Sequence, residues 1–482
     1  MTNLNKSTIG RFCLNYSDKN RNDSFYEIYQ RTKEYILKPS IPKGTRDFTP
    51  EQVSKRNYIF NTIKKVFLKY GYQPIETPVM ESLSTLTGKY GEEGDKLLFK
   101  VLNNGDYLKK ADKQALAAAD SVKLIPSISK RGLRYDLTVP FARYVVMHQN
   151  EIAFPFKRYQ IQPVWRADRP QKGRYQEFYQ CDVDVVGSDS LMYEAELVQI
   201  YDEVFAALGV KVEIKVNNRK ILAGIAAAAG IPNQFVEMTV AIDKLDKIGI
   251  EGVRKELGER GIPTTAIDKI DEILQVRSLV PLKTLLKDSE VGLKGIEELE
   301  EFHRYFDLRT PANKVVFDIT LARGLNYYTG CIFEVKAADV QMGSIGGGGR
   351  YDDLTSVFGL KNVSGVGVSF GAARIFDVME ELGLFPSERG DALKILFVAL
   401  DDAAHKYAFD CLNKVRAAGI NADLYPAPTK MKKQMKYAND RKVPFVAIIG
   451  SQELEEQKVQ LKNMETGEQS LLNIEEVINK LT

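Results

Sequence analysis

The chain has 482 residues, a length typical of about three domains. Its hydrophobic content of 44% and charged content of 27% are those of ordinary globular proteins, and its net charge of +3 is too small to indicate nucleic-acid binding by itself. No apolar run is long enough to span a membrane, and the first forty residues carry acidic side chains that transit peptides lack. We therefore predict a cytoplasmic protein.

Neither the cysteines nor the histidines form a recognisable catalytic or metal-binding pattern. The 4 Cys and 3 His are scattered singly along the chain, without a CxxC pair. Isolated cysteines are typical of free thiols in a reducing compartment. The sequence therefore predicts no protein-bound metal and no Ser-His-Asp hydrolase.

Ordered structure is predicted to begin at Lys38, after a polar extension over residues 1–37. Apolar side chains then recur at helical spacing from Glu51 to Tyr70. Strand-like runs follow, and prolines interrupt the first of them. These predicted strands are Tyr72–Met80, Gly132–Val139, Phe156–Trp165 and Arg174–Val186. A helix is predicted next, at Ser190–Leu208.

The middle of the chain changes character. From about 217 to 311, alanine-rich and Glu/Lys-rich segments dominate, which predicts a helical insertion. Strands are predicted again at Lys314–Val335 and Asn362–Gly371, with a helix at Ala372–Leu382. Many strands with few crossover helices favour an antiparallel α+β core, so residues 38–390 are predicted as one such domain with a helical insertion.

Residues 391–482 are predicted as a separate domain. The apolar run Leu393–Leu400 precedes a helix that ends near Ala418. Strand-like Ala422–Tyr425, a lysine-rich helix and strand-like Val443–Ile449 follow. This alternation of strands and helices predicts a small α/β domain with a largely parallel sheet.

A permanent cation and two aromatic residues lie close together in the run Leu-Ala-Arg-Gly-Leu-Asn-Tyr-Tyr-Thr-Gly. Arg323 stands four and five residues before Tyr327 and Tyr328. Arginine keeps its charge and presents a fork of donors that suits a carboxylate or a phosphate, and tyrosine supplies a flat wall with a polar tip. An edge strand with a surface arginine is an equally good interpretation of this segment alone.

Two strand-like arms farther upstream flank a loop rich in arginine. The four cations of this turn are Arg166, Arg169, Lys172 and Arg174. Like charges repel unless an anion joins them, so the loop indicates a polyphosphate site. The polar side chains of the returning strand are Glu177, Gln180 and Asp184. A solvated basic hairpin is the alternative interpretation.

Three further segments are ambiguous on their own. In Arg-Tyr-Asp-Leu-Thr, a period of two would put Asp136 and Thr138 on one face of a strand, where they suit an ammonium group or a cross-strand bond. The glycine run Gly343–Asp352 permits close approach of a ligand, or is a flexible hairpin turn, and it is not a Walker or dinucleotide motif. In Val366–Arg374 a glycine-spaced strand leads into a helix whose early Arg374 indicates a nearby anion or a plain surface arginine.

Together these segments resemble the class II aminoacyl-tRNA synthetases, and among them the histidyl-tRNA synthetases. Tyr58–Pro78 is similar to the first class II motif, a dimer-interface helix and strand. The arginine hairpin resembles the second motif, and the strand and helix around Arg374 resemble the third. Leu-Ala-Arg-Gly-Leu-Asn-Tyr-Tyr and Gly-Gly-Gly-Gly-Arg-Tyr-Asp resemble two signatures of the histidine enzymes.

The resemblance implies a two-step reaction in which histidine and ATP form histidyl-adenylate, which then acylates the terminal ribose of tRNA(His). The implied catalytic cations are Arg323 and Arg166. The implied ATP contacts are Arg166, Arg174, Glu177 and Arg374. The implied histidine contacts are Asp136, Thr138, Arg166, Gln180, Asp184, Arg323, Tyr327 and Tyr328. Mg²⁺ is expected on the pyrophosphate oxygens, and a homodimer is implied.

The C-terminal unit is similar to the anticodon-binding domain of these enzymes. Its lysine-rich segment carries a local cluster of cations suited to a phosphate backbone, although a solvated helix face is a competing interpretation. The lysines implied to bind tRNA are Lys430, Lys432, Lys433 and Lys436.

One departure and one alternative remain open at this point. The hairpin of the family commonly ends Gly-Arg-Tyr-Arg, whereas Gln176 stands at the last position here. This change puts details of tRNA contact in doubt more than the activation chemistry. The alternative is a catalytically inactive, synthetase-like regulatory subunit of histidine biosynthesis, which keeps the core fold but lacks the anticodon-binding domain.

Overall fold

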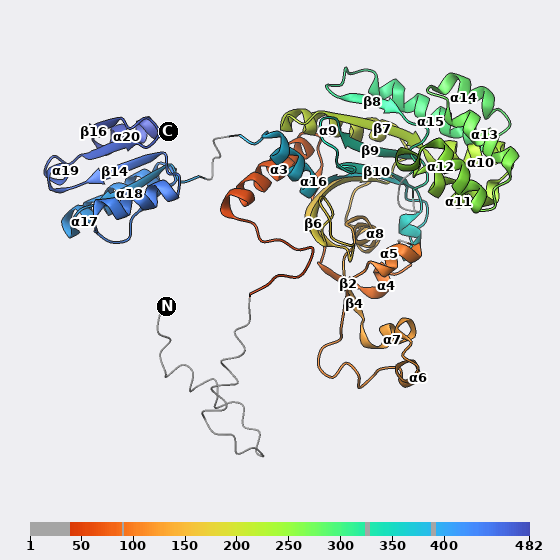
Figure 1. Cartoon of the computed structure of the whole chain (residues 1–482), viewed down its shortest axis with the longest axis horizontal. Helices are drawn as coiled ribbons and strands as arrows, with labels where there is room; N and C mark the ends of the chain where they lie inside the picture. The colour runs from red at the N-terminus through yellow and green to blue at the C-terminus, as the bar shows by residue number, and fades with distance from the viewer. Residues whose placement is uncertain (1–38, 89–90, 323–327, 387–391) are drawn as a thin grey trace, which may run out of the picture.

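The computed structural model describes residues 39–88, 91–322, 328–386 and 392–482 (Figure 1). A twisted sheet forms the centre of the larger domain, with the strand order β1-β5-β6-β11-β10-β9-β7-β8. Pairing is antiparallel from β5 to β7, and only the edge strands β1 and β8 are parallel to their neighbours in the described sheet. These strands are β1 (Gln73–Pro74), β5 (Phe156–Trp165), β6 (Glu177–Val186), β7 (Val212–Asn218), β8 (Lys314–Phe317), β9 (Cys331–Ala337), β10 (Gly346–Tyr351) and β11 (Gly365–Gly371). The prediction of an antiparallel α+β core is confirmed.

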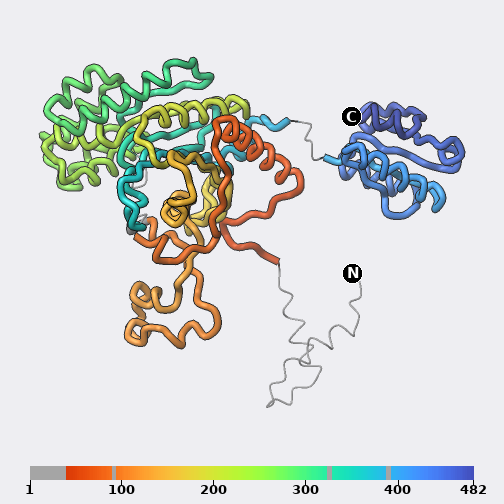
Figure 2. The backbone as a smooth tube through the Cα atoms, turned by 180° about the vertical axis from the view of Figure 1, so that it is seen from behind, coloured from red at the N-terminus to blue at the C-terminus, as the bar shows by residue number. Residues whose placement is uncertain are grey.

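The two faces of this sheet differ in chemistry because side chains alternate along each strand. On β6, Cys181, Val183 and Val185 are fully buried in the main hydrophobic core. Helices cover this apolar face, and Figure 2 shows them from behind. They are α3 (Pro50–Lys69), α9 (Met192–Leu208), α15 (Glu290–Phe306) and α16 (Ala372–Leu382). The alternate residues of β6 carry amide and carboxylate groups to the opposite face, which is therefore free to build a polar site.

Helix α3 begins with a capping box, in which the Thr49 side chain accepts from the backbone of Gln52 and the Gln52 side chain accepts from that of Thr49. The predicted helix over Glu51–Tyr70 is confirmed. The predicted strand Tyr72–Met80 is wrong as a single element. Its start is β1, which contains Pro74, and its end belongs to β2 (Met80–Ser82) in a different sheet. Between them lies Pro78, which has no N–H to donate to a ladder.

A small sheet lies beside the main one, with the order β2-β4-β3. It comprises β2, β3 (Lys100–Val101) and β4 (Arg131–Leu133), and the chain between β3 and β4 projects outward in Figure 1. The short helices of this region are α4 (Leu83–Leu86), α5 (Gly91–Lys96), α6 (Lys113–Ala117) and α7 (Ser121–Ile128).

The predicted strand Gly132–Val139 is wrong beyond Leu133. Residues Thr138–Met147 form helix α8 instead. Asp136 accepts a hydrogen bond from the backbone N–H of Val139 at 3.2 Å and so satisfies one of the free donors at the helix start. Asp136 and Thr138 therefore do not share one face of a strand.

The helical insertion is present as a bundle between β7 and β8 (Figure 1). Its first and last helices pack closely, since a Cβ on Gly224 would lie 2.5 Å from the Cα of Gly292. Besides α15, the insertion contains α10 (Arg219–Ala228), η1 (Pro232–Gln234), α11 (Phe235–Ile242), α12 (Leu245–Glu259), α13 (Thr264–Leu274) and α14 (Leu279–Leu285).

The C-terminal domain has its own sheet, ordered β13-β12-β14-β15-β16. Its first three strands are parallel, as predicted, and two antiparallel strands that the sequence patterns did not indicate extend it. The strands are β12 (Ile395–Ala399), β13 (Ala422–Leu424), β14 (Phe445–Ile449), β15 (Val459–Asn463) and β16 (Gln469–Leu472). The helices are α17 (Asp402–Ala417), α18 (Met431–Asp440), α19 (Ser451–Glu455) and α20 (Ile474–Leu481).

Within the described residues, no helix is both long and apolar enough to cross a membrane.

Candidate active site

A cavity of about 440 Å³ opens on the polar face of the main sheet. Its walls come from the loop between β5 and β6, the glycine strand β10, the end of β11 and the start of α16. The predicted site residues that line it are Arg166, Arg174, Gln180, Tyr328 and Arg374. Segments separated by about two hundred residues thus supply cations, an amide and an aromatic ring to one space.

Arg166 stands at the first position after β5, where its backbone N–H donates to the carbonyl of Gln176 across the hairpin at 3.0 Å. The guanidinium carbon lies 4.2 Å from the ring centroid of Tyr135, and Nε donates to the Tyr135 carbonyl at 3.1 Å. Ring and carbonyl together fix the plane of the guanidinium, which suits bidentate contact with a phosphate or a carboxylate.

Arg374 occupies the first turn of α16 and bridges two of the cavity walls. Its Nε donates to the carbonyl of Gly173 at 2.7 Å, and its Nη1 donates to the carbonyl of Ser344 at 2.5 Å. These two bonds tie the arginine loop to the segment before β10. Arg174 lies across the same cavity, 3.7 Å from a carboxylate oxygen of Asp168.

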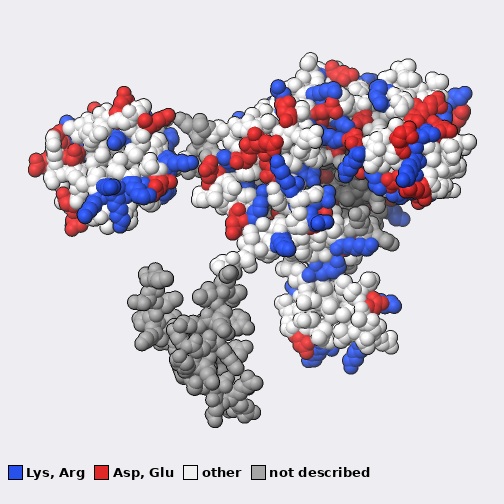
Figure 3. All heavy atoms as spheres, in the orientation of Figure 1, with Lys and Arg blue, Asp and Glu red and all other residues white. Residues whose placement is uncertain are grey.

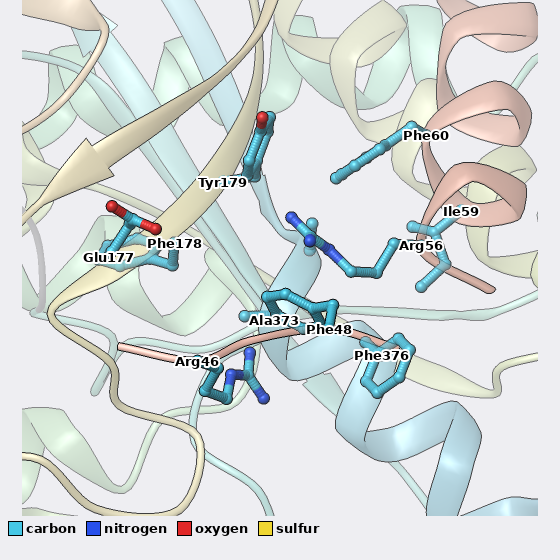
Figure 4. Close-up of a pocket in the computed structure, with 11 residues that line it drawn as sticks. Arg46, Phe48, Arg56, Ile59, Phe60, Glu177, Phe178, Tyr179, Ala373 and Phe376 are labelled. Atoms are coloured by element: carbon cyan, nitrogen blue, oxygen red, sulfur yellow. The ribbon is translucent and has the colours of Figure 1, made fainter. Parts of the chain in front are cut away.

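Glu177 does not line this cavity. It begins β6 on the opposite face, accepts a hydrogen bond from the indole Nε1 of Trp165 at 2.8 Å, and lines a second cavity of about 220 Å³ (Figure 4). Arg46, Arg56 and several aromatic rings surround that second space.

The glycine run forms the central strand β10, so the interpretation as a flexible hairpin turn is wrong. A Cβ on Gly348 would lie 2.2 Å from the carbonyl oxygen of Gly367, and one on Gly346 would lie 2.8 Å from the ring of Tyr201. Gly346, Gly347 and Gly348 all line the cavity. Glycine is required here because strand β10 packs closely on one side and borders the cavity on the other.

Gln180 lines the cavity from β6 and donates from Nε2 to the hydroxyl of Ser369 at 3.1 Å. Among the described residues, its buried Oε1 has no hydrogen-bond partner. A buried acceptor without a partner costs free energy unless a ligand donates to it. Tyr328 is half-buried and lines the cavity from the other side.

Asp184 is buried on the same face of β6 but is not among the lining residues. It forms an ion pair with Arg158 at 2.8 Å and accepts a hydrogen bond from the hydroxyl of Tyr351 at 2.7 Å. Burial raises the pKa of its carboxyl group, and the charge of Arg158 opposes this effect. Asp136 and Thr138 likewise lie outside the cavity lining, at the start of α8.

Arg323 and Tyr327 lie outside the described residues, so their predicted roles are carried by the sequence alone.

Sequence reasoning missed Asp182, which lies between Gln180 and Asp184 in the alternation of β6. It is buried, pairs across the sheet with Gln160 and Ser369, and its Oδ1 has no hydrogen-bond partner among the described residues. Burial raises the pKa of its carboxyl group, with Arg158 acting in the opposite direction. A period of two along this strand puts Asp182 on the same face as Gln180 and Asp184, and that pattern would have found it.

Two family models match the chain. One, described as histidyl-tRNA synthetase, matches residues 44–108 and 105–375, and the other, an anticodon binding domain, matches residues 394–482. The histidine–tRNA ligase of Phocaeicola vulgatus is 60% identical over 446 residues, which are 92% of this chain and 98% of that protein. The chain belongs to the histidyl-tRNA synthetase family.

Other relatives and solved structures agree with this assignment. The histidine–tRNA ligase of Cytophaga hutchinsonii is 54% identical over 92% of this chain and 99% of its own. The crystal structure of histidyl-tRNA synthetase from Nostoc sp. superposes with a TM-score of 0.78 at 30% identity, over 92% of this chain and 100% of that one. The crystal structure of an ATP phosphoribosyltransferase regulatory subunit/histidyl-tRNA synthetase from Bacillus halodurans has a TM-score of 0.67 at 19% identity and shows the fold alone.

The C-terminal domain carries its basic cluster on one face. The four predicted lysines are exposed on α18 and at its N-terminal cap, and Figure 3 shows a group of Lys and Arg on this domain. Lys436 pairs with Asp440 at 2.5 Å, whereas no ion pair within the described residues engages Lys432 or Lys433. An exposed group of unpaired lysines suits a polyanion better than a neutral partner.

Proposed function

We propose that the chain is a histidine–tRNA ligase. Its residues Arg166, Arg174 and Arg374 bind ATP and the histidine carboxylate in the cavity of about 440 Å³, called the large cavity below. The observation that carries the proposal is the convergence of Arg166, Arg174 and Arg374 on this cavity, next to a buried acceptor of Gln180. The regulatory alternative finds no support in relatives of this identity, since the full-length matches are ligases.

In the first step, an oxygen of the histidine carboxylate attacks the α-phosphorus of ATP, and the bond to pyrophosphate breaks. Negative charge accumulates on the α-phosphate oxygens, and preorganised cations there lower the barrier. Arg166, whose plane is fixed by Tyr135, would neutralise the α-phosphate and orient the attacking carboxylate. Arg323 would supply a second positive charge. Arg174 and Arg374 would bind the outer phosphates.

Histidine recognition would use the polar face of the sheet. Gln180 would accept from the ammonium group, and Asp184, Asp136 and Thr138 would form the acidic and hydroxyl surroundings behind it. Tyr327 and Tyr328 would bound the imidazole. In the second step, a ribose hydroxyl of tRNA(His) attacks the carbonyl of the adenylate, and AMP leaves.

Mg²⁺ fits this site as a companion of ATP. The carboxylates among the lining residues are Asp168 and Glu334, and both already contact neighbouring side chains, Arg174 and Ser344. No group of three His, Cys, Asp or Glu residues in the described ranges is arranged to hold a metal ion. When bound, Mg²⁺ would neutralise charge on the leaving pyrophosphate, with the phosphates as its main ligands.

The partner surfaces follow from the same proposal. Lys430, Lys432, Lys433 and Lys436 would contact the tRNA(His) backbone near the anticodon. The helix α3 and the edge strand β1 would form a homodimer interface. Size-exclusion chromatography with light scattering tests this assembly, and a monomer at micromolar concentration contradicts it.

The test of the activation step is ATP–pyrophosphate exchange. Exchange should require histidine and should not be supported by other amino acids. A well-folded chain that binds histidine without catalysing exchange would overturn the ligase assignment in favour of a regulatory role.

A further inference from the structure

The arginine loop between β5 and β6 depends on contacts outside itself. Eleven residues, 166–176, connect the two strands and carry Arg166, Arg169, Lys172 and Arg174. Internal bonds are few: the backbones of Gln171 and Arg174 form one isolated bridge. Mutual repulsion of four cations would spread such a loop, so something else must hold it in place.

Helix α16 provides one set of anchors. Three residues on one face of the helix, at spacings of three and four, each contact the loop. Arg374 donates to the Gly173 carbonyl at 2.7 Å, Asp377 accepts from the Tyr175 hydroxyl at 2.8 Å, and Glu381 pairs with Lys172 at 2.9 Å. The Lys172–Glu381 pair is exposed, so solvent weakens it. Burial raises the pKa of Tyr175, and its bond to Asp377 acts in the same direction.

The segment before α3 completes the anchorage. The Arg46 guanidinium carbon lies 3.5 Å from the centroid of the Tyr175 ring, and its Nη1 lies 3.5 Å from the other oxygen of Asp377. Arg46 thus contacts both partners of the Tyr175–Asp377 hydrogen bond. Figure 4 shows Arg46 beside the first turns of α16, near Ala373.

Gly44, two residues earlier, holds the same end of the loop. Its carbonyl accepts from the backbone N–H of Gln176 at 2.8 Å, and a Cβ at Gly44 would lie 2.6 Å from Cγ of Gln176. The Gln176 side chain turns back to donate to the Asp168 carbonyl at 2.9 Å. Gln176 therefore braces the loop from inside, and it is not among the residues that line the large cavity.

We propose that Arg46 is a positioning residue for ATP binding. By clamping Tyr175 against Asp377, it fixes Arg174, the neighbour of Tyr175, relative to Arg374, one turn before Asp377 on α16. The cations then face the cavity before ATP arrives, so ATP binding does not have to order the loop. This inference rests on the proposed ligase function, because it assigns ATP to the large cavity.

The test is ATP–pyrophosphate exchange by the full-length chain, with the KM values for ATP and histidine and the thermal midpoint measured for each variant. Arg46→Ala should raise the KM for ATP by about tenfold, since it removes a partly buried cation–ring contact and a charged contact. The KM for histidine and the thermal midpoint should change little. Arg46→Lys keeps the charge without the flat stacking surface and should give an intermediate KM for ATP.

Two further variants separate the clamp from a general effect. Tyr175→Phe keeps the ring but removes the bond to Asp377, and its effect on the KM for ATP should be less than additive with that of Arg46→Ala. Glu381→Gln, which removes only the exposed anchor on the same helix face, should leave the KM for ATP unchanged.

An unchanged KM for ATP in Arg46→Ala would overturn the inference. An equal rise in the KM for ATP and the KM for histidine, together with a lower thermal midpoint, would also overturn it, because these changes would indicate a purely structural role. These results are distinct from failure of the proposed function, in which the unmodified chain itself catalyses no histidine-dependent exchange.

Discussion

Asp182 and Asp184 place two carboxylates on one buried face, and the charge of Arg158 acts on both. Arg158 forms its ion pair with Asp184, and Asp182 keeps one oxygen without a hydrogen-bond partner among the described residues. A single guanidinium does not neutralise two buried carboxylates, so without a ligand this face favours a proton on one of them. The ammonium group of an amino acid would supply the missing positive charge.

Asp182→Asn should therefore change stability in a pH-dependent way. Burial raises the folded-state pKa of Asp182 above its unfolded value, so its contribution to stability is greatest at acid pH and is lost as the pH rises through the folded pKa. Between pH 5 and pH 8, the ligand-free Asn variant should gain roughly 1–3 kcal/mol of stability relative to the parent. Thermal or urea unfolding at both pH values measures this difference.

The exposed Asp440→Asn on α18 serves as the control, and its difference from the parent should not grow between the two pH values. If the stability difference between the Asp182→Asn variant and the parent is the same at pH 5 and pH 8, the raised pKa of Asp182 is contradicted.

At the residue scale, local sequence patterns predicted the arginines that line the cavity but not the residue that positions them. Arg166 and Arg174 were found because clustered cations demand an anion, and Arg374 because an arginine at a helix start indicates a nearby anion. The structure brings all three to one cavity. Arg46 could not be found in this way, because its role depends on a ring and a carboxylate that are more than a hundred residues away. Nothing in the local sequence signals that contact.

At the scale of elements, the lysine-rich helix α18 makes a specific prediction. Lys432 and Lys433 are exposed and have no ion-pair partner in the described structure, so each should release about one counterion when it meets a phosphate. The double substitution Lys432→Ala/Lys433→Ala should weaken tRNA(His) binding and reduce the slope of log affinity against log salt by roughly two. Filter binding or fluorescence titration at several salt concentrations measures both.

Lys414→Ala on α17 is the matched control, since Lys414 is exposed in the same domain but pairs with Asp410 at 2.9 Å. An equal loss for the control, or an unchanged salt slope for the double variant, would indicate that α18 presents an ordinary solvated face.

Elements with a clear period were predicted well, and those that depend on distant partners were not. β5 and α16 have the predicted bounds because their apolar and polar residues alternate at the period of the element. The segment around Asp136 was taken for a strand because its apolar residues are β-compatible. It becomes α8 because Asp136 satisfies the helix start and tertiary packing buries Val139 and Phe141. β10 was missed because four glycines carry no strand propensity, and only the neighbouring strands require them.

At the scale of the whole molecule, the proposed activation site and the proposed tRNA-binding lysines lie in domains with separate hydrophobic cores. The C-terminal domain has its own hydrophobic clusters on both sides of its sheet. A chain ending at residue 390 should therefore retain most of the histidine-dependent exchange. Its rate of tRNA charging should fall at least about tenfold, because the deleted lysines no longer contribute to tRNA affinity. Parallel exchange and charging assays compare the two activities. Equal losses in both would indicate that the C-terminal domain mainly stabilises the catalytic domain.

The central claim is that this chain attaches histidine to tRNA(His). The most direct measurement is the transfer of labelled histidine to a tRNA(His) transcript by the full-length protein, with ATP and Mg²⁺ present. We predict acid-precipitable histidyl-tRNA that depends on ATP, and a fall of several orders of magnitude for Arg166→Ala. No charging of tRNA(His) by folded protein, or undiminished charging by Arg166→Ala, would contradict the account.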